Sequence, residues 1–208
     1  MRQLFPDLWQ TQAQYPFGPE VSTHAYLWLR PDGNVLFYNT SLTDELDAIE
    51  DLGGIAWQYL SHRDEVAPSL AQIRRRFGAR LCCHVLEAPA VARVQAGDVS
   101  FDTAHSPLPD LFVLPTPGHT PGSTCYRVRS SQGQTYLFTG DTLFPDGAGW
   151  GTYVAASERG VLRQSLELLR TPTPDVVLSS AARDPDGYRL PSGDDWQRIL
   201  DEAVERLK

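Results

Sequence analysis

Short apolar runs alternate with amphipathic segments in the first half of the chain. Runs rich in β-branched and aromatic residues predict strands over residues 7–10, 23–30, 35–38, 55–60, 80–84 and 97–101. Apolar residues at helical spacing predict helices over residues 42–52, 65–77 and 86–94. Ser41 or Thr43 is expected to be the N-cap of the first of these helices, because short hydroxyl side chains cap free backbone N–H groups.

The second half of the chain repeats this order of strands followed by helices. Strands are expected over residues 111–114, 124–129, 135–138 and 176–178, and helices over 157–170 and 192–207. Residues 145–151 form a glycine-rich segment that we expect to be a loop, with Trp150 in the wall of a pocket. Two strand-rich halves, each followed by helices, predict a two-sheet sandwich with its helices outside. A length of 208 residues fits a single domain spanning 1–208.

Charge and cysteine content narrow the range of partners. The formal net charge is −8, from 18 basic and 26 acidic residues, which argues against nucleic acid because phosphate binding needs a basic surface. Cys82, Cys83 and Cys125 show no metal-binding or disulfide spacing, so free thiols in a reducing compartment are expected. No run approaches about 18 apolar residues, so neither a signal peptide nor a membrane span is expected. These features predict a cytoplasmic location.

The most specific local signal is a histidine held between two Pro-Gly pairs. Residues 114–123 read Leu-Pro-Thr-Pro-Gly-His-Thr-Pro-Gly-Ser, and the histidine is His119. Proline fixes φ and glycine permits positive φ, so each pair favours a turn and the backbone between the turns is held stiffly. A histidine on a rigid loop at a strand end is well placed to bind a metal or to act as a base.

A second strand end carries a carboxylate. Residues 136–144 read Tyr-Leu-Phe-Thr-Gly-Asp-Thr-Leu-Phe, so Asp141 directly follows an apolar strand and a glycine. His119 and Asp141 are residue types that hold metals. Together, the two segments resemble the metallo-β-lactamase superfamily. The resemblance implies an α/β fold, an αββα four-layer sandwich, with one or two metals bound at the edge of its sheets.

The resemblance also implies further ligands, which this chain carries only in part. Members of the superfamily have His-x-His-x-Asp-His after an early strand, whereas residues 60–65 here read Leu-Ser-His-Arg-Asp-Glu. His62 matches either the first histidine of that motif, with two residues deleted, or the second. We prefer the first alignment, because Ser-His stands at the strand end. In both alignments Glu65 replaces the last histidine, and Ala181 stands where a later histidine is expected.

What remains is His62, His119 and Asp141, with Asp64 close by. Two imidazoles and one carboxylate suit a mononuclear site, either Zn(II) with a water or Fe(II) with open positions. Asp64 would hydrogen-bond or deprotonate the water, or it would instead N-cap the following helix. Whether Glu65 is an additional ligand stays open.

Each candidate also has a purely structural interpretation. His62 could be a capping or core residue, and Asp141 could stabilise a turn. Of the other histidines, His24 is expected in a strand, His84 at a strand end outside the ligand set, and His105 in an exposed loop.

Three functions are compatible with such a reduced site. The first, which we prefer, is a metal-dependent hydrolase of a small ester or thioester, in which the metal activates water and stabilises an oxyanion. The second is a mononuclear non-haem iron dioxygenase of a sulfur compound, by analogy with the superfamily's persulfide dioxygenases, whose first motif is intact. The third is a non-catalytic protein that has kept the fold and lost the metal. The preferred function implies a small-molecule substrate and one divalent metal, Zn or Fe.

Overall fold

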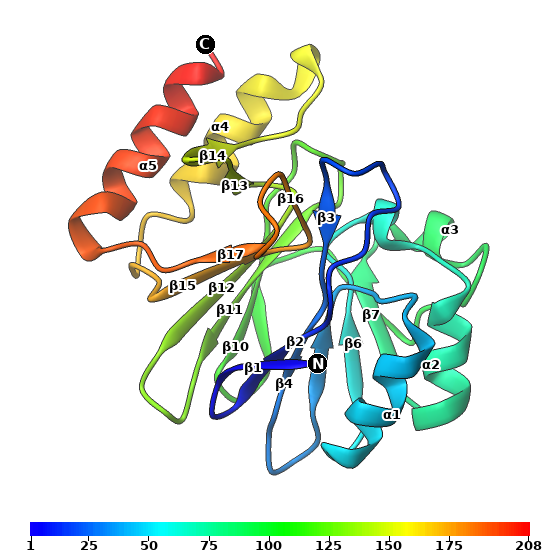
Figure 1. The fold of residues 1–208 in the computed structure, drawn as a ribbon. Coiled ribbons are helices and arrows are strands. Elements are labelled where there is room, and N and C mark those ends of the chain that lie inside the picture. Colours follow the sequence, from blue (N-terminus) through cyan, green and yellow to red (C-terminus); the bar gives the residue numbers. More distant parts are fainter.

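Two β-sheets pack face to face, and helices cover both outer faces (Figure 1). The structure, a computed structural model, describes residues 1–208, except for the solvent exposure of residue 193. The first half of the chain builds one sheet and the second half builds the other. The predicted αββα sandwich is therefore confirmed. Among the helices described, none is long and apolar enough to cross a bilayer.

The first sheet has seven strands in the order β1-β2-β4-β5-β6-β7-β8. Their bounds are β1 Arg2–Phe5, β2 Leu8–Gln10, β4 Tyr26–Trp28, β5 Val35–Phe37, β6 Trp57–Tyr59, β7 Arg80–His84 and β8 Val99–Phe101. The strands from β5 to β8 run parallel to one another, so their carboxyl ends lie at one edge of the sheet. The connections between them are the helices α1 (Thr43–Asp51), α2 (Ser69–Phe77) and α3 (Ala88–Val91), which lie outside the sheet (Figure 1).

The second sheet has six strands in the order β17-β15-β12-β11-β10-β9. Their bounds are β9 His105–Leu108, β10 Leu111–Pro115, β11 Thr124–Arg129, β12 Thr135–Gly140, β15 Val176–Ser179 and β17 Tyr188–Arg189. Only β12 and β15 pair in parallel. The outer face carries α4 (Arg159–Glu167) and α5 (Gly193–Arg206). Two short pairs complete the fold, β13 (Phe144–Asp146) with β14 (Gly149–Gly151) and β3 (Ser22–Thr23) with β16 (Ala181–Ala182).

Aromatic side chains fill the space between the sheets. Phe37 of β5 stacks on Phe138 of β12 with ring centroids 3.8 Å apart, and Tyr126 of β11 lies 5.4 Å from Phe37. Alternate residues of the same strands, such as Cys125 and Leu137, belong instead to a second apolar cluster shared with α4 and α5. This period-two alternation buries both faces of the second sheet.

Proline position explains why one helix is shorter than expected. The helix predicted over 65–77 is replaced by a 3₁₀ turn, η1 (Arg63–Glu65), and by α2, which begins at Ser69. Pro68 is the N-cap of α2, and a residue that precedes proline disfavours the helical region, so the helix does not extend back through Ala67. The expectation that Asp64 caps this helix is therefore wrong.

Three other expectations about local structure are also wrong. The strand predicted over 23–30 is interrupted, and His24 lies in the gap between β3 and β4, where its backbone N–H donates to the Ser180 carbonyl. His105 opens strand β9 instead of lying in a loop. The N-cap of α1 is Leu42 and makes no side-chain cap, so neither Ser41 nor Thr43 has that role.

The glycine-rich segment 145–151 is part of a hairpin, β13–β14, and not a loop. Trp150 is buried, and its ring lies 6.4 Å from that of Trp196 on α5. Residues 145–151 border neither cavity beside the site, so the expectation that this segment forms part of its wall is wrong. The hairpin instead contributes Phe144 to a cavity beside the site described below.

Tyr38 ties the ends of the two sheets together. It follows β5 in the left-handed region, with φ of 70°, and its side chain is fully buried. Its hydroxyl donates to the Leu178 carbonyl at 2.8 Å and accepts from the Gly140 N–H at 2.8 Å. Burial raises the pKa of Tyr38 well above its ordinary value, so the hydroxyl keeps its proton. Because Gly140 precedes Asp141, this contact also fixes the end of β12.

Replacing Tyr38 with Phe should lower the free energy of unfolding by about 2 kcal/mol, because the buried Gly140 N–H would lose its partner and the Leu178 carbonyl would keep only the Thr139 hydroxyl. Urea unfolding followed by circular dichroism measures this change. Tyr15→Phe is the matched control, because the Tyr15 side chain is 50% exposed. Equal stabilities for the two variants would show that the Tyr38 hydroxyl does not join the sheets.

Candidate metal centre

Loops from both sheets meet at one edge of the sandwich. His62 follows β6, and Asp141 follows β12. Ser180 follows β15, the parallel neighbour of β12, and His119 lies in the loop between β10 and β11. In α/β proteins the carboxyl ends of parallel strands form crevices that hold functional groups. Residues from distant parts of the chain therefore share one small volume.

The side chains of His62, His119 and Asp141 converge on one point. One nitrogen or oxygen atom from each lies within 4.8 Å of the other two. Asp141 Oδ2 is 3.5 Å from His62 Nε2 and 3.6 Å from His119 Nε2. The two imidazole rings are nearly perpendicular, with centroids 4.6 Å apart. Two imidazole nitrogens and a carboxylate oxygen arranged in this way can hold one divalent metal.

The remaining ring nitrogens are already engaged by the protein. His119 Nδ1 lies 3.0 Å from the Tyr153 carbonyl, to which it can only donate. His62 Nδ1 lies 2.8 Å from Ser61 Oγ and 3.3 Å from Glu65 Oε1. In both rings Nε2 is left facing the centre, and His119 Nε2 is buried with no hydrogen-bond partner among the described residues. Metal-binding histidines need this arrangement, so the residues fit a metal.

The backbone around two of these residues depends on glycine. Gly140 has φ of 54°, and a Cβ there would lie 2.7 Å from Ser61 Cβ. Gly118 has φ of 147°, and a Cβ there would lie 2.9 Å from Leu162 Cα on α4. A positive φ and a close approach both exclude larger residues, which explains the glycine just before Asp141 and the one just before His119.

Opposite charges dominate the electrostatics of the centre. Burial alone lowers the pKa of His62, but the carboxylates of Asp141 and Glu65 outweigh it and raise that pKa well above its usual value. Burial alone raises the pKa of Asp141, but His62, His119 and a 2.7 Å hydrogen bond from Ser180 hold it far below its ordinary range. The centre is therefore a negative region that favours a cation.

Asp64 stands beside the centre and not within it. Its side chain is 51% exposed, and its Oδ2 lies 3.4 Å from His119 Nε2. The interaction with His119 lowers the pKa of Asp64, so its carboxyl group is ionised at neutral pH. The side chain borders both cavities described below, where it can reach a bound molecule.

Glu65 turns away from the point of convergence. Its carboxylate accepts from the Ser61 N–H at 2.9 Å and from the Ser61 hydroxyl, and it lies on the Nδ1 side of His62. Asn39 in turn donates to the Glu65 carbonyl at 2.9 Å. Glu65 therefore orients His62 from behind, and it does not provide a fourth atom to the cluster.

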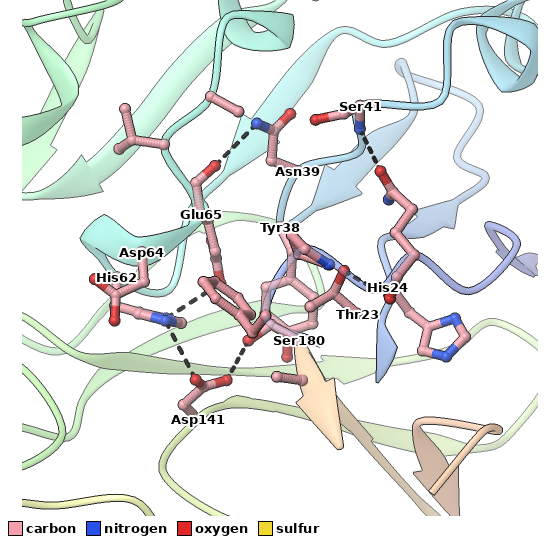
Figure 2. A pocket seen from close by; sticks show the side chains of 16 residues that line it. Thr23, His24, Tyr38, Asn39, Ser41, His62, Asp64, Glu65, Asp141 and Ser180 are labelled. Carbon is pink, nitrogen blue, oxygen red and sulfur yellow. Dashed lines mark hydrogen bonds and ion pairs between the residues drawn. The ribbon is translucent and has the colours of Figure 1, made fainter. Parts of the chain in front are cut away.

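Two cavities open on either side of the centre. Figure 2 shows the first, of about 440 Å³, with Asp141 between His62 and Ser180. The second, of about 360 Å³, reaches His119. Both are bordered by Asp64 and Asp141, so a molecule bound at the centre has room to extend in two directions. His24, expected to be a plain strand residue, borders the first cavity.

A buried carboxylate that sequence analysis did not single out joins two of the site loops. Glu87 is 1% exposed and accepts five hydrogen bonds. Three come from Arg63, next to His62, at 2.5 Å from Nε, 2.9 Å from Nη2 and 3.1 Å from the backbone N–H. The others come from the Thr120 hydroxyl at 3.0 Å and the Gly122 N–H at 2.7 Å, in the His119 loop. Nothing in the spacing of Glu87 along the chain marks this role.

A family model described as the metallo-beta-lactamase superfamily matches residues 42–181. The match covers more than half of the chain and includes His62, His119 and Asp141. The chain belongs to the metallo-β-lactamase superfamily. The resemblance found in the sequence is therefore confirmed. A metallo-β-lactamase from Pontibacter korlensis superposes with a TM-score of 0.71 at 21% identity, covering 99% of this chain and 96% of that one, which shows the shared superfamily fold.

Two hydroxyacylglutathione hydrolases are similar to this superfamily member over part of its length. The one from Rhizobium meliloti is 36% identical over 110 residues, which are 50% of this chain and 40% of that protein. The one from Acidiphilium cryptum is 28% identical over 128 residues, 60% of this chain and 51% of that protein. The matches span about half or less of these relatives.

Replacing Glu87 with Gln should destabilise the fold by about 1–3 kcal/mol at pH 7, because buried hydrogen bonds would lose a charged acceptor while Arg63, which is 39% exposed, stays hydrated. It should also weaken zinc binding about tenfold, because the two histidine loops would no longer be joined. Urea unfolding and isothermal titration calorimetry measure the two effects. Glu50→Gln is the control, because Glu50 pairs with Arg76 at the surface and is 60% exposed.

The stability difference between wild type and Glu87→Gln should depend on pH, and its direction follows from the pKa of Glu87. Burial raises the pKa of Glu87, but Arg63, the Gly122 N–H and Thr120 together bring it below the ordinary 4.5. A carboxyl with a lowered pKa stabilises the fold above its unfolded-state pKa, and this contribution is lost as pH falls through the folded-state value. The stability difference between wild type and Glu87→Gln should therefore shrink below about pH 4.5. A difference that stays constant down to pH 3 would contradict an ionised Glu87.

Proposed function

We propose that this protein is a metal-dependent hydrolase of small esters or thioesters, with one divalent metal held by His62, His119 and Asp141. The observation that carries the proposal is the convergence of these three side chains with the Nε2 atom of each imidazole facing the centre. A divalent metal in this position would polarise a carbonyl oxygen and acidify a water molecule.

The surrounding residues supply the other requirements of hydrolysis. Asp64 is ionised and lies 3.4 Å from His119 Nε2, so it can orient a water at the centre and accept the proton that the water gives up. Glu65, Ser61 and the Tyr153 carbonyl hold the imidazoles from behind. Because these partners fix the rings before a substrate arrives, no binding energy is spent on orienting them.

A thioester is the favoured substrate because of the partial similarity to hydroxyacylglutathione hydrolases. The two cavities support an ester or thioester, since such a molecule extends on both sides of its carbonyl. We further propose zinc as the metal, since a site with two imidazoles, one carboxylate and a water is typical of catalytic zinc.

Replacing His119 with Ala should remove metal binding. Protein purified without chelator from medium containing zinc and iron should hold about one metal ion per chain, and the variant close to none. Elemental analysis measures this. His105→Ala is the control, because His105 lies in β9 and its Nδ1–H donates to the Thr103 carbonyl, away from the centre. An unchanged metal content in His119→Ala would overturn the proposed centre.

Replacing Asp64 with Asn should lower kcat for thioester hydrolysis about 10²- to 10⁴-fold and leave the metal content unchanged, because the amide cannot accept a proton. Release of free thiol from a simple thioester gives the rate. The control is Asp102→Asn, at an exposed acid beyond β8. Full activity in Asp64→Asn would rule out its role as a base.

The metal content of the purified protein also distinguishes the proposed hydrolase from an iron dioxygenase and from a non-catalytic protein. Bound iron with consumption of O₂ in the presence of a persulfide would replace the hydrolase by an iron dioxygenase. Absence of any metal, even after incubation with zinc and iron, would replace it by a non-catalytic protein of the same fold.

A further inference from the structure

The two cavities beside the centre share Phe17 and Ala181 but differ in the charge of their linings. The first is bordered by apolar residues such as Phe17 and Val66 and by polar and acidic ones such as Asn39 and Glu65, and no lysine or arginine is among the described residues that line it. The second is bordered mainly by apolar and aromatic side chains, and its lining also includes Arg183. The apolar and aromatic residues are Phe17, Val21, Phe144, Tyr153, Ala181 and Ala182. A molecule with two unlike ends would therefore bind in one direction.

Arg183 has a fixed backbone and an unengaged charge. It directly follows β16, and its N–H donates to the Pro145 carbonyl of β13 at 3.0 Å. The neighbouring Asp184 pairs with Arg189 at 2.9 Å instead. No ion pair or side-chain hydrogen bond of Arg183 is found within the part of the chain that the structure describes. A guanidinium without a protein partner at a cavity wall is available to a ligand.

The aromatic residues at this cavity are unusually open to solvent. Phe17 is 63% exposed and Tyr153 is 68% exposed. Phe17 comes from the segment before β3, and Tyr153 comes from the segment after β14, so the cavity lies between them. An apolar group bound there would remove both rings from water, which favours binding.

Charge determines which end of a substrate this cavity accepts. A divalent metal at the centre would offset the charges of Asp64 and Asp141, the two acids in the lining. Arg183 would then be the uncompensated charge, so a negative group would be attracted to this side. The first cavity offers the carboxylate of Glu65 and neither lysine nor arginine among its described residues, so it would attract the same group less.

The geometry points to the second cavity as a subsite for an apolar group, aromatic in the best case, that ends in an anion. The substrate is then an ester or thioester with such a group on one side of the carbonyl and an uncharged group in the first cavity. This inference rests on the proposed hydrolase function and specifies the substrate class of the same site. Arg183 is its specificity-determining residue.

The first experiment compares two thioesters that differ only in the charged end. S-(4-carboxybenzyl) thioacetate and S-(4-carbamoylbenzyl) thioacetate have the same aromatic group, and only the first is an anion. Arg183→Ala should raise KM for the carboxylate about tenfold with little change in kcat. The same substitution should change KM for the amide by no more than about twofold. Arg183→Lys should restore most of the loss. Equal effects on both substrates, or none on either, would overturn the assignment.

The second experiment measures binding without catalysis. p-Toluenesulfonate is titrated into the protein as purified, with methyl p-tolyl sulfone as its neutral counterpart, and amide shifts are followed by NMR. The sulfonate should perturb residues around Phe17, Tyr153 and Arg183, and its affinity should fall about tenfold in Arg183→Ala. Shifts confined to the first cavity, or affinity independent of Arg183, would overturn the subsite.

Together, the experiments separate this inference from the proposed function. If neither thioester is hydrolysed but the sulfonate binds through Arg183, the subsite holds and the hydrolase proposal fails. If both thioesters are hydrolysed and Arg183→Ala does not distinguish them, the hydrolase holds and the subsite fails.

Discussion

The loops at the active edge are arranged around a largely buried carboxylate, that of Asp141, which lies between two imidazoles and is 16% exposed. Asp141 has both of its oxygen atoms committed, one to Ser180 and the other toward His62 and His119. Ionised groups are costly to bury unless opposite charges and hydrogen bonds compensate them. With Asp64 and Glu65 close by, negative charge is concentrated at this edge, and protonation of His62 or a bound cation can balance it. The loops around the centre must therefore be held firmly enough to keep the charges in place.

Contacts outside the three converging residues provide this rigidity. Tyr38 fixes the end of β12 just before Asp141, and Glu65 holds the ring of His62. Glu87 receives donors from both histidine loops, so these loops are joined through one buried group. Few other residues could replace these side chains, because removing a buried hydrogen-bond partner leaves an unsatisfied polar atom. The precision of the centre thus comes from hydrogen bonds that lie behind it.

The same edge gives the site its direction. Both cavities include the exposed ring of Phe17, but among the described lining residues Glu65 borders the first and the guanidinium of Arg183 borders the second. The two cavities meet at Asp64 and Asp141, so any reaction at the centre takes place where the charge of the lining changes. Shape and charge beside the metal, together with its ligands, would then select the substrate.

The class of fold and the turns around His119 follow from the order of residues along the chain. Periodic apolar residues identified most strands and helices, and the Pro-Gly pairs around His119 predicted its rigid loop, because these signals act between near neighbours. Features that depend on contacts between distant residues became visible in the folded chain. Folding brought Glu87 against both histidine loops, turned Glu65 behind His62, moved Trp150 into the core and placed Arg183 at a cavity. Side-chain direction depends on packing between elements far apart in the chain, and residue spacing along the sequence carries no record of that packing.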